Sequence, residues 1–199
     1  IWFGFPYFDL LIGVLSVLAM LELLVITSQG DSEIDIYVAL LGFCFGSVFF
    51  MLSHLYLAVI SFCLGWLFAI FSTSRSLTNT GWAGFGYIYI ATAAISLSQI
   101  REVSDEGRLI IFWFFAIIWG NDIGAYIIGR ALGGPRIAPR ISPGKTWTGT
   151  LGGLGVSGLT SLCFMGTILV TPGVASLVVA SLALAIGAQL GDLAESSFK

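Results

Sequence analysis

The fold is decided by one apolar stretch, LIIFWFFAIIWGNDIGAYIIG, which covers residues 109–129. It contains a single charged residue, Asp122. A helix of about 20 apolar residues is long enough to cross the ~30 Å hydrocarbon core of a bilayer. The apolar residues do not alternate with polar ones, which argues against the strands of an outer-membrane barrel. The stretch therefore predicts a transmembrane helix that carries a carboxylate.

The whole chain has the same apolar character. Of its 199 residues, 57% are hydrophobic and 10% are charged. Soluble globular domains have about 25% charged residues. The shortage of charge in this chain therefore predicts that most of its residues are not exposed to water. The net charge of −3 gives no indication of a nucleic-acid partner. The three cysteines lie far apart in apolar stretches without metal-ligand spacing, which favours lipid-facing or packed thiols.

Seven apolar stretches predict an all-α fold, a polytopic transmembrane helical bundle in one integral membrane domain, residues 1–199. The predicted spans are residues 10–28, 38–53, 55–72, 83–99, 109–129, 148–170 and 174–193. The second and third spans share a tight turn near Ser53 and His54. All the sequence motifs lie in residues 109–199. Residues 1–108 are characterised only by their apolar stretches and by one acid within a predicted span, Glu22. This acid could make a structural hydrogen bond or belong to a functional site.

Glycines spaced four residues apart occur in three of these spans. The pairs are Gly42/Gly46, Gly120/Gly124 and Gly149/Gly153. Small residues at this spacing let helix backbones approach each other in a membrane. The pairs therefore predict close helix packing.

The basic residues predict the orientation. The loop after the fifth span contains Arg130, Arg136, Arg140 and Lys145 and no acid. Loops rich in Lys and Arg stay on the cytosolic side. We therefore expect a multi-pass protein of a bacterial inner membrane or an equivalent membrane, with this loop in the cytosol.

The fifth span brings a carboxylate toward that side. Helical spacing places Asp122, Tyr126 and Gly129 on one face, and Arg130 follows at the cytosolic end. An ionisable group inside a span is a functional candidate by default. The structural alternative is a buried Asp paired with a neighbouring Arg.

A second charged stripe emerges at the cytosolic end of the last span. It consists of Asp192, Glu195, Ser196 and Lys199, at positions i, i+3, i+4 and i+7 of one helical face. A charged stripe at a helix end is often only solvated. The predicted topology, however, brings this stripe to the same side as Asp122.

The basic loop between them adds two hydroxyls, Ser142 and Thr146, and a backbone freed by Gly and Pro. Such a loop suits phosphate oxygens, although it would also suit anionic lipid head groups. The triplet Gly144–Thr146 is not part of a P-loop, because Pro139 stands where the first glycine is required.

Paired carboxylates hold Mg²⁺, and Mg²⁺ with Lys and Arg neutralises polyphosphate. The pattern predicts a magnesium-dependent enzyme acting on a lipid-borne phosphate.

Three segments together resemble the phosphatidate cytidylyltransferases (CDP-diacylglycerol synthases). They are DIGAYIIGR at residues 122–130, ISPGKT at 141–146 and GDLAESSFK at 191–199. The resemblance covers the second half of the chain. It implies that CTP and phosphatidic acid are converted to CDP-diacylglycerol and pyrophosphate at the bilayer surface, with Mg²⁺ as cofactor. The resemblance also makes a homodimer possible.

The resemblance also implies roles for individual residues. Asp192 would contribute to the metal site, and Asp122 would be a second metal-binding or substrate-orienting carboxylate; with Lys145 they are the expected catalytic residues. The expected substrate-binding residues are Tyr126, Arg130, Ser142, Thr146, Glu195, Ser196 and Lys199. The chain departs from the family at Gly144, where a second Lys is usual. The family signature also continues beyond Lys199, so we expect the chain to be a truncated fragment, inactive as it stands.

Two other functions fit the same residues less well. One is a CTP-dependent lipid kinase of the polyprenol or phytol type, which would make a phospho-lipid instead of a CDP-lipid. The other is an ion-coupled transporter with Asp122 and Asp192 as ion ligands. A transporter predicts broken helices at the bilayer midplane, whereas these acids lie toward one side.

Overall fold

The computed structural model describes residues 5–28, 33–72, 77–102, 106–139, 141–165 and 173–198. Its elements are α1 (Tyr7–Ser28), α2 (Glu33–Met51), α3 (Leu55–Ser72), α4 (Leu77–Glu102), α5 (Gly107–Leu132), β1 (Arg136–Ala138), β2 (Ser142–Thr146), α6 (Trp147–Cys163) and α7 (Val174–Phe198). Each predicted span corresponds to one helix, which confirms the all-α prediction apart from one small hairpin. The chain forms two compact units, Ile1–Asp105 and Glu106–Lys199.

The helices differ from the predicted spans mainly at their ends. α4 continues beyond residue 99 to Glu102, and α5 continues beyond residue 129 to Leu132. Arg, Glu and Leu are good helix formers, so these helices continue past the apolar stretches from which they were predicted. The sixth predicted span, 148–170, is described as a helix only through Cys163.

Within the described part of the chain, four helices are long and apolar enough to cross a membrane. They are Tyr7–Thr27, Gly81–Glu102, Gly107–Leu132 and Val174–Ala194, whereas the apolar parts of α2 and α3 are shorter. Only 17% to 28% of the residues in these four are buried within the protein. Their outward faces are rich in Leu, Val, Ile and Phe. Apolar surface on this scale indicates contact with lipid rather than water.

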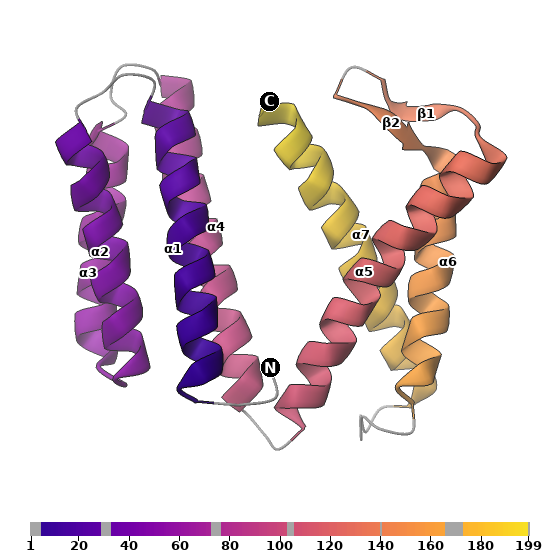
Figure 1. The fold of residues 1–199 in the computed structure, drawn as a ribbon, viewed down its shortest axis with the longest axis horizontal. Coiled ribbons are helices and arrows are strands. Elements are labelled where there is room, and N and C mark those ends of the chain that lie inside the picture. The colour runs from indigo at the N-terminus through magenta and orange to yellow at the C-terminus, as the bar shows by residue number, and fades with distance from the viewer. Residues whose placement is uncertain are drawn as a thin grey trace. The chain divides into compact units, whose positions relative to one another are not determined.

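In the first unit, α1 packs beside α4, and α2 packs beside α3 (Figure 1). The predicted turn between α2 and α3 is confirmed, because Ser53 has a φ of 60° and the His54 N–H donates to the Phe49 carbonyl at 2.9 Å. α2 and α3 are almost in backbone contact. A Cβ added to Gly42 would lie 2.6 Å from the Gly65 Cα, so a larger residue there would push the helices apart.

In the second unit, α5 and α6 approach each other along facing glycines. A Cβ on Gly149 would lie 2.7 Å from the Ala125 carbonyl, and a Cβ on Gly153 would lie 2.7 Å from the Asn121 carbonyl. The close packing predicted from glycine spacing is thereby confirmed. α7 lies against both helices. β1 and β2 lie where α5 ends and α6 begins, and α7 runs toward that same end of the unit (Figure 1).

The predicted thiol environments are also confirmed. All three cysteines are free; Cys63 and Cys163 are exposed on apolar helices, and Cys44 is half-buried.

Candidate active site

The predicted face of α5 carries its polar groups on an exposed strip. Asp122 and Tyr126 are both exposed. The Arg130 guanidinium donates from Nη1 to the Tyr126 hydroxyl at 2.8 Å and lies 6.0 Å from the centre of its ring. Asp122 is not paired with Arg130 in this arrangement; its Oδ1 accepts a hydrogen bond from the Asn121 amide at 3.2 Å. The strip thus ends in the Arg130 guanidinium, which the Tyr126 hydroxyl orients. The Asp122 carboxylate lies about two helical turns earlier.

The basic loop is more ordered than the sequence indicated. Residues 136–138 and 142–146 form an antiparallel hairpin, with Arg136 opposite Thr146 and Ala138 opposite Ser142. The Trp147 N–H donates to the Pro135 carbonyl at 3.0 Å and ties the hairpin to the start of α6. Three glycines and three prolines between residues 133 and 144 obscured these strands, because such residues predict irregular backbone.

Thr146 has a structural task in addition to its predicted phosphate contact. It is the N-cap of α6, with φ −114° and ψ 153°, and its Oγ1 accepts from the Gly149 N–H at 3.1 Å. A Thr at this position satisfies one of the free N–H groups at the helix start. Thr148, which the sequence analysis missed, lies 3.1 Å from the Thr146 Oγ1 and donates to the Gly133 carbonyl. The two hydroxyls therefore fix the hairpin on α6.

The hairpin reaches α7 through one ion pair. The Lys145 Nζ lies 2.6 Å from the Asp192 Oδ2 and 3.4 Å from the Gln189 carbonyl oxygen. The Lys145 side chain is 23% exposed and that of Asp192 is 59% exposed. This ion pair brings two predicted catalytic residues into direct contact, although α6 and most of α7 lie between them in the sequence. The predicted meeting of the basic loop with the last span is confirmed for this pair.

A buried polar contact holds the three helices together beside that pair. The Gln189 amide donates from Nε2 to the Asn121 Oδ1 at 2.8 Å and to the Thr150 carbonyl at 3.3 Å. Asn121 is 1% exposed. Because Asp122 is next to Asn121 and Asp192 is one helical turn beyond Gln189, this contact sets the positions of both carboxylates. The sequence analysis missed both amides, although a polar residue inside an apolar span is itself a signal.

We expect Gln189→Met to destabilise the second unit. The substitution keeps the length of the side chain but leaves the buried Asn121 Oδ1 without its donor, which costs about 1–3 kcal/mol. Thermal unfolding in detergent would show a lower midpoint. Leu190→Met is the matched control, because Leu190 is 61% exposed on the same helix. Equal midpoints for the two variants would contradict a structural role for the Asn121–Gln189 bond.

The end of α7 is described only in part. The Ser196 hydroxyl donates to the Asp192 carbonyl at 2.8 Å, which anchors it to its own helix. The side chain of Glu195 lies outside the described residues, as do Lys199 and Arg140. Their predicted roles stay predictions.

Few of the described acids lie where they could form a magnesium site. Among the residues that the structure describes, no group of three His, Cys, Asp or Glu side chains could hold a metal ion. Asp122 and Asp192 are exposed. The Asp122 Oδ1 accepts from the Asn121 amide, and the Asp192 Oδ2 pairs with Lys145. Mg²⁺ keeps several waters and takes one or two carboxylates together with substrate phosphates. The two carboxylates fit that requirement in donor chemistry.

Two curated relatives are similar to this chain in sequence. The chain is 40% identical to the phosphatidate cytidylyltransferase of Brucella melitensis over 131 residues, which are 66% of this chain and 48% of that protein. It is 37% identical to the enzyme of the same name from Staphylococcus saprophyticus over 117 residues, 59% of this chain and 45% of that protein. The chain spans about half the length of the curated relatives it matches. No solved structure matches it significantly.

The match to a family as a whole is more extensive than any of these pairwise matches. The sequence profile described as the cytidylyltransferase family matches residues 1–199, which is the entire chain. Both compact units are covered, including the first, where the motifs are absent. The chain belongs to the cytidylyltransferase family.

Proposed function

We propose that this chain carries part of a phosphatidate cytidylyltransferase, which makes CDP-diacylglycerol and pyrophosphate from CTP and phosphatidic acid. The observation that carries the proposal is the Lys145–Asp192 ion pair at 2.6 Å. It joins the basic hairpin to the acidic end of α7, beside the buried contact that positions Asp122. The names of the relatives support the same reaction.

In the proposed reaction, an oxygen of the phosphatidate phosphate attacks the α-phosphorus of CTP. A bond forms between that oxygen and the α-phosphorus, and the bond between the α-phosphorus and the bridging oxygen to the β-phosphorus breaks. Pyrophosphate leaves with the electron pair. Such transfers depend mainly on positioning and on neutralising charge. Lys145 and Arg130 supply cations for phosphate oxygens, and Tyr126 orients the Arg130 guanidinium.

Asp122 and Asp192 are the residues that would hold Mg²⁺. When bound, the ion would neutralise phosphate charge next to Lys145. The remaining proposed contacts with the substrates are Ser142, Thr146, Glu195, Ser196 and Lys199. For Thr146, that contact would have to coexist with the N-cap hydrogen bond.

We further propose a multi-pass arrangement in a bacterial inner membrane or an equivalent membrane, with the site facing the cytosol. Arg130, Arg136 and Lys145 lie together at the hairpin end of the second unit, and such basic segments stay on the cytosolic side. Phosphatidic acid would then reach the site from the adjacent leaflet. The homodimer stays a prediction, which light scattering in detergent would check.

The position of the radioactive label distinguishes the cytidylyltransferase from a CTP-dependent lipid kinase. With the whole protein, Mg²⁺ and phosphatidic acid, we expect label from the α-phosphate of CTP to enter the lipid fraction. Label from the γ-phosphate should leave as pyrophosphate. A lipid kinase would produce the opposite distribution and would accept a lipid alcohol instead of phosphatidic acid. Label in neither lipid would contradict both enzymes and favour the transporter.

A further inference from the structure

The first unit contains a buried carboxylate that the proposed reaction does not use. Asp9, in the first turn of α1, is 6% exposed. Its Oδ2 is buried and has no hydrogen-bond partner among the residues that the structure describes. Burying an ionised carboxylate without a partner is strongly unfavourable. The Asp9 Oδ2 is therefore an unsatisfied oxygen acceptor in the interior of the first unit, as far as the described residues show.

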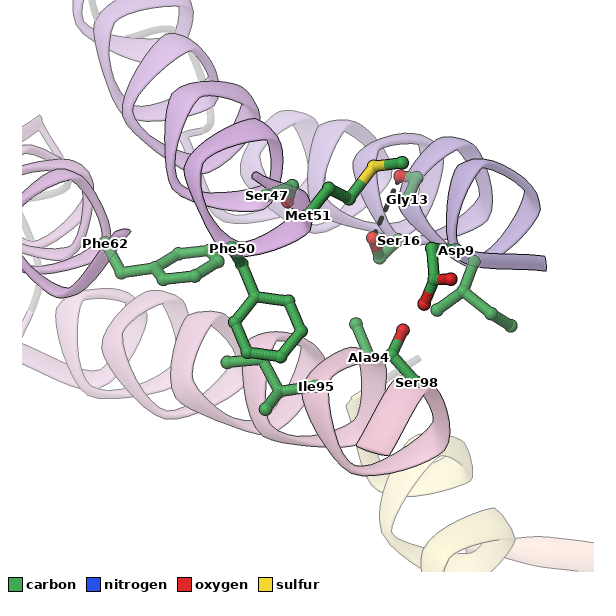
Figure 2. Close-up of a pocket in the computed structure, with 11 residues that line it drawn as sticks. Asp9, Gly13, Ser16, Ser47, Phe50, Met51, Phe62, Ala94, Ile95 and Ser98 are labelled. Atoms are coloured by element: carbon green, nitrogen blue, oxygen red, sulfur yellow. Dashed lines mark hydrogen bonds between the residues drawn. The ribbon is translucent and has the colours of Figure 1, made fainter. Parts of the chain in front are cut away.

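A small cavity adjoins this carboxylate. It has a volume of about 20 Å³ and lies among α1, α2, α3 and α4. Figure 2 shows Asp9, Ser16 and Ser98 bordering the same space. A volume of ~10–15 Å³ already holds one water, so this cavity admits a single guest of about that size.

The polar groups of the cavity offer oxygen acceptors. The Ser16 hydroxyl donates to the Gly13 carbonyl at 2.9 Å, and the Ser47 hydroxyl donates to the Phe43 carbonyl at 3.0 Å. Each hydroxyl has one proton and two lone pairs, so these two oxygens face any guest as acceptors. The lining residues include no Lys, Arg or His. One negative charge and several neutral oxygens therefore surround a space for one small guest.

A second, larger cavity adjoins the first. It has a volume of about 580 Å³ and shares Asp9, Phe50 and Met51 with the small cavity. Gln99 and Glu102 also line it. Asp9 thus borders a larger space whose lining includes an acid and an amide. Such a lining attracts cations and repels anions.

We propose that Asp9, with the hydroxyl oxygens of Ser16, Ser47 and Ser98, forms a binding site for one small monovalent cation. The size of the cavity limits the guest to one ion. Oxygen ligands select hard cations, and the single carboxylate matches a single positive charge. The site lies wholly in the first unit and shares no residue with the Lys145–Asp192 pair.

The proposal is tested by thermal unfolding of the purified chain in detergent, with NaCl replacing choline chloride at constant ionic strength. A ligand that binds only the folded state raises the melting temperature as its concentration rises. We expect a saturable rise of several degrees with Na⁺, and parallel titrations with K⁺ and Li⁺ rank the ions by size. Equilibrium retention of radioactive sodium should approach one ion per chain.

Two variants make the test specific to the site. Asp9→Asn should abolish the dependence on Na⁺ while keeping the shape of the side chain. Because Oδ2 makes no hydrogen bond to the described residues, the substitution breaks none at that atom. Ser16→Ala should raise the half-saturating Na⁺ concentration at least about tenfold, a loss seen even for outer partners of metal ligands. Glu22→Gln is the matched control, because Glu22 is an exposed acid on the same helix, and it should respond as the wild type does.

Two results would overturn the proposal. A wild-type melting temperature that is indifferent to Na⁺, K⁺ and Li⁺ would mean that a water molecule, and not a cation, fills the cavity beside Asp9. A rise that persists in Asp9→Asn would place the ion elsewhere.

Discussion

Asp192→Asn in the whole protein is expected to reduce CDP-diacylglycerol formation to background, a fall of at least about 100-fold, which is the scale for losing one preorganised electrostatic contact. The amide keeps the shape of the side chain but removes the charge that pairs with Lys145 at 2.6 Å. It also removes one of the two carboxylates proposed to hold Mg²⁺. The measurement is transfer of α-labelled CTP to phosphatidic acid at saturating Mg²⁺.

Glu106→Gln provides the control for the loss of a negative charge. Glu106 precedes α5 at the end remote from Arg130 and makes no side-chain cap hydrogen bond. This variant should retain wild-type activity. Wild-type levels of product from Asp192→Asn would exclude the carboxylate from the metal site. Inactivity of both variants would instead indicate a general effect of charge on the fold, which their melting temperatures would reveal.

Gly153→Ala should destabilise the second unit by about 1–3 kcal/mol, the usual effect of overpacking a well-packed interior. The added Cβ would lie 2.7 Å from both the backbone carbonyl and the Oδ1 of Asn121. Neither atom can move freely, because Asn121 is buried and its Oδ1 accepts from Gln189. The added methyl would therefore push α6 away from α5 and disturb Asp122. A lower midpoint of thermal unfolding and a loss of transferase activity should appear together.

Gly155→Ala is the matched control, on the same helix and with the same change in composition. A Cβ at Gly155 would meet nothing within 4 Å. Since Ala is more favourable than Gly in a helix by about 0.8–1.0 kcal/mol, this variant should be slightly more stable than the wild type. The two substitutions are thus expected to have opposite signs. Equal midpoints would show that α5 and α6 are not in close contact at Gly153.

Much of the candidate site could be predicted because it depends on local spacing. The exposed side of α5 carries Asp122 and Tyr126 because residues four apart share one helical face. The convergence of Lys145 and Asp192 followed from an alternating topology, which brings the basic loop and the end of the last span to the same side. In each case the prediction required only the length of the helices and the direction of the chain.

Other parts of the site could not be predicted because they depend on contacts between distant residues. The capping role of Thr146 is a local feature that was missed: a Thr just before a predicted helix, here the span 148–170, is a capping signal, but Thr146 was predicted only as a phosphate contact. Asn121 and Gln189 are 68 residues apart in sequence, and nothing local pairs them. Asp9 lay in no predicted span, and only the packing of α1 against its neighbours reveals that its carboxylate is buried.

The sequence by itself determined that this chain is a helical membrane protein and which residues could handle phosphate. The number and length of the apolar stretches predict the helices. Because a charged group in lipid is energetically costly, acids and bases within or next to these stretches are candidates for a functional role. The tertiary structure decided which of those groups meet. The Lys145–Asp192 pair, the Asn121–Gln189 bond and the buried Asp9 carboxylate arise from the angles and distances at which helices pack. Between α5 and α6, the close approach depends on Gly149 and Gly153.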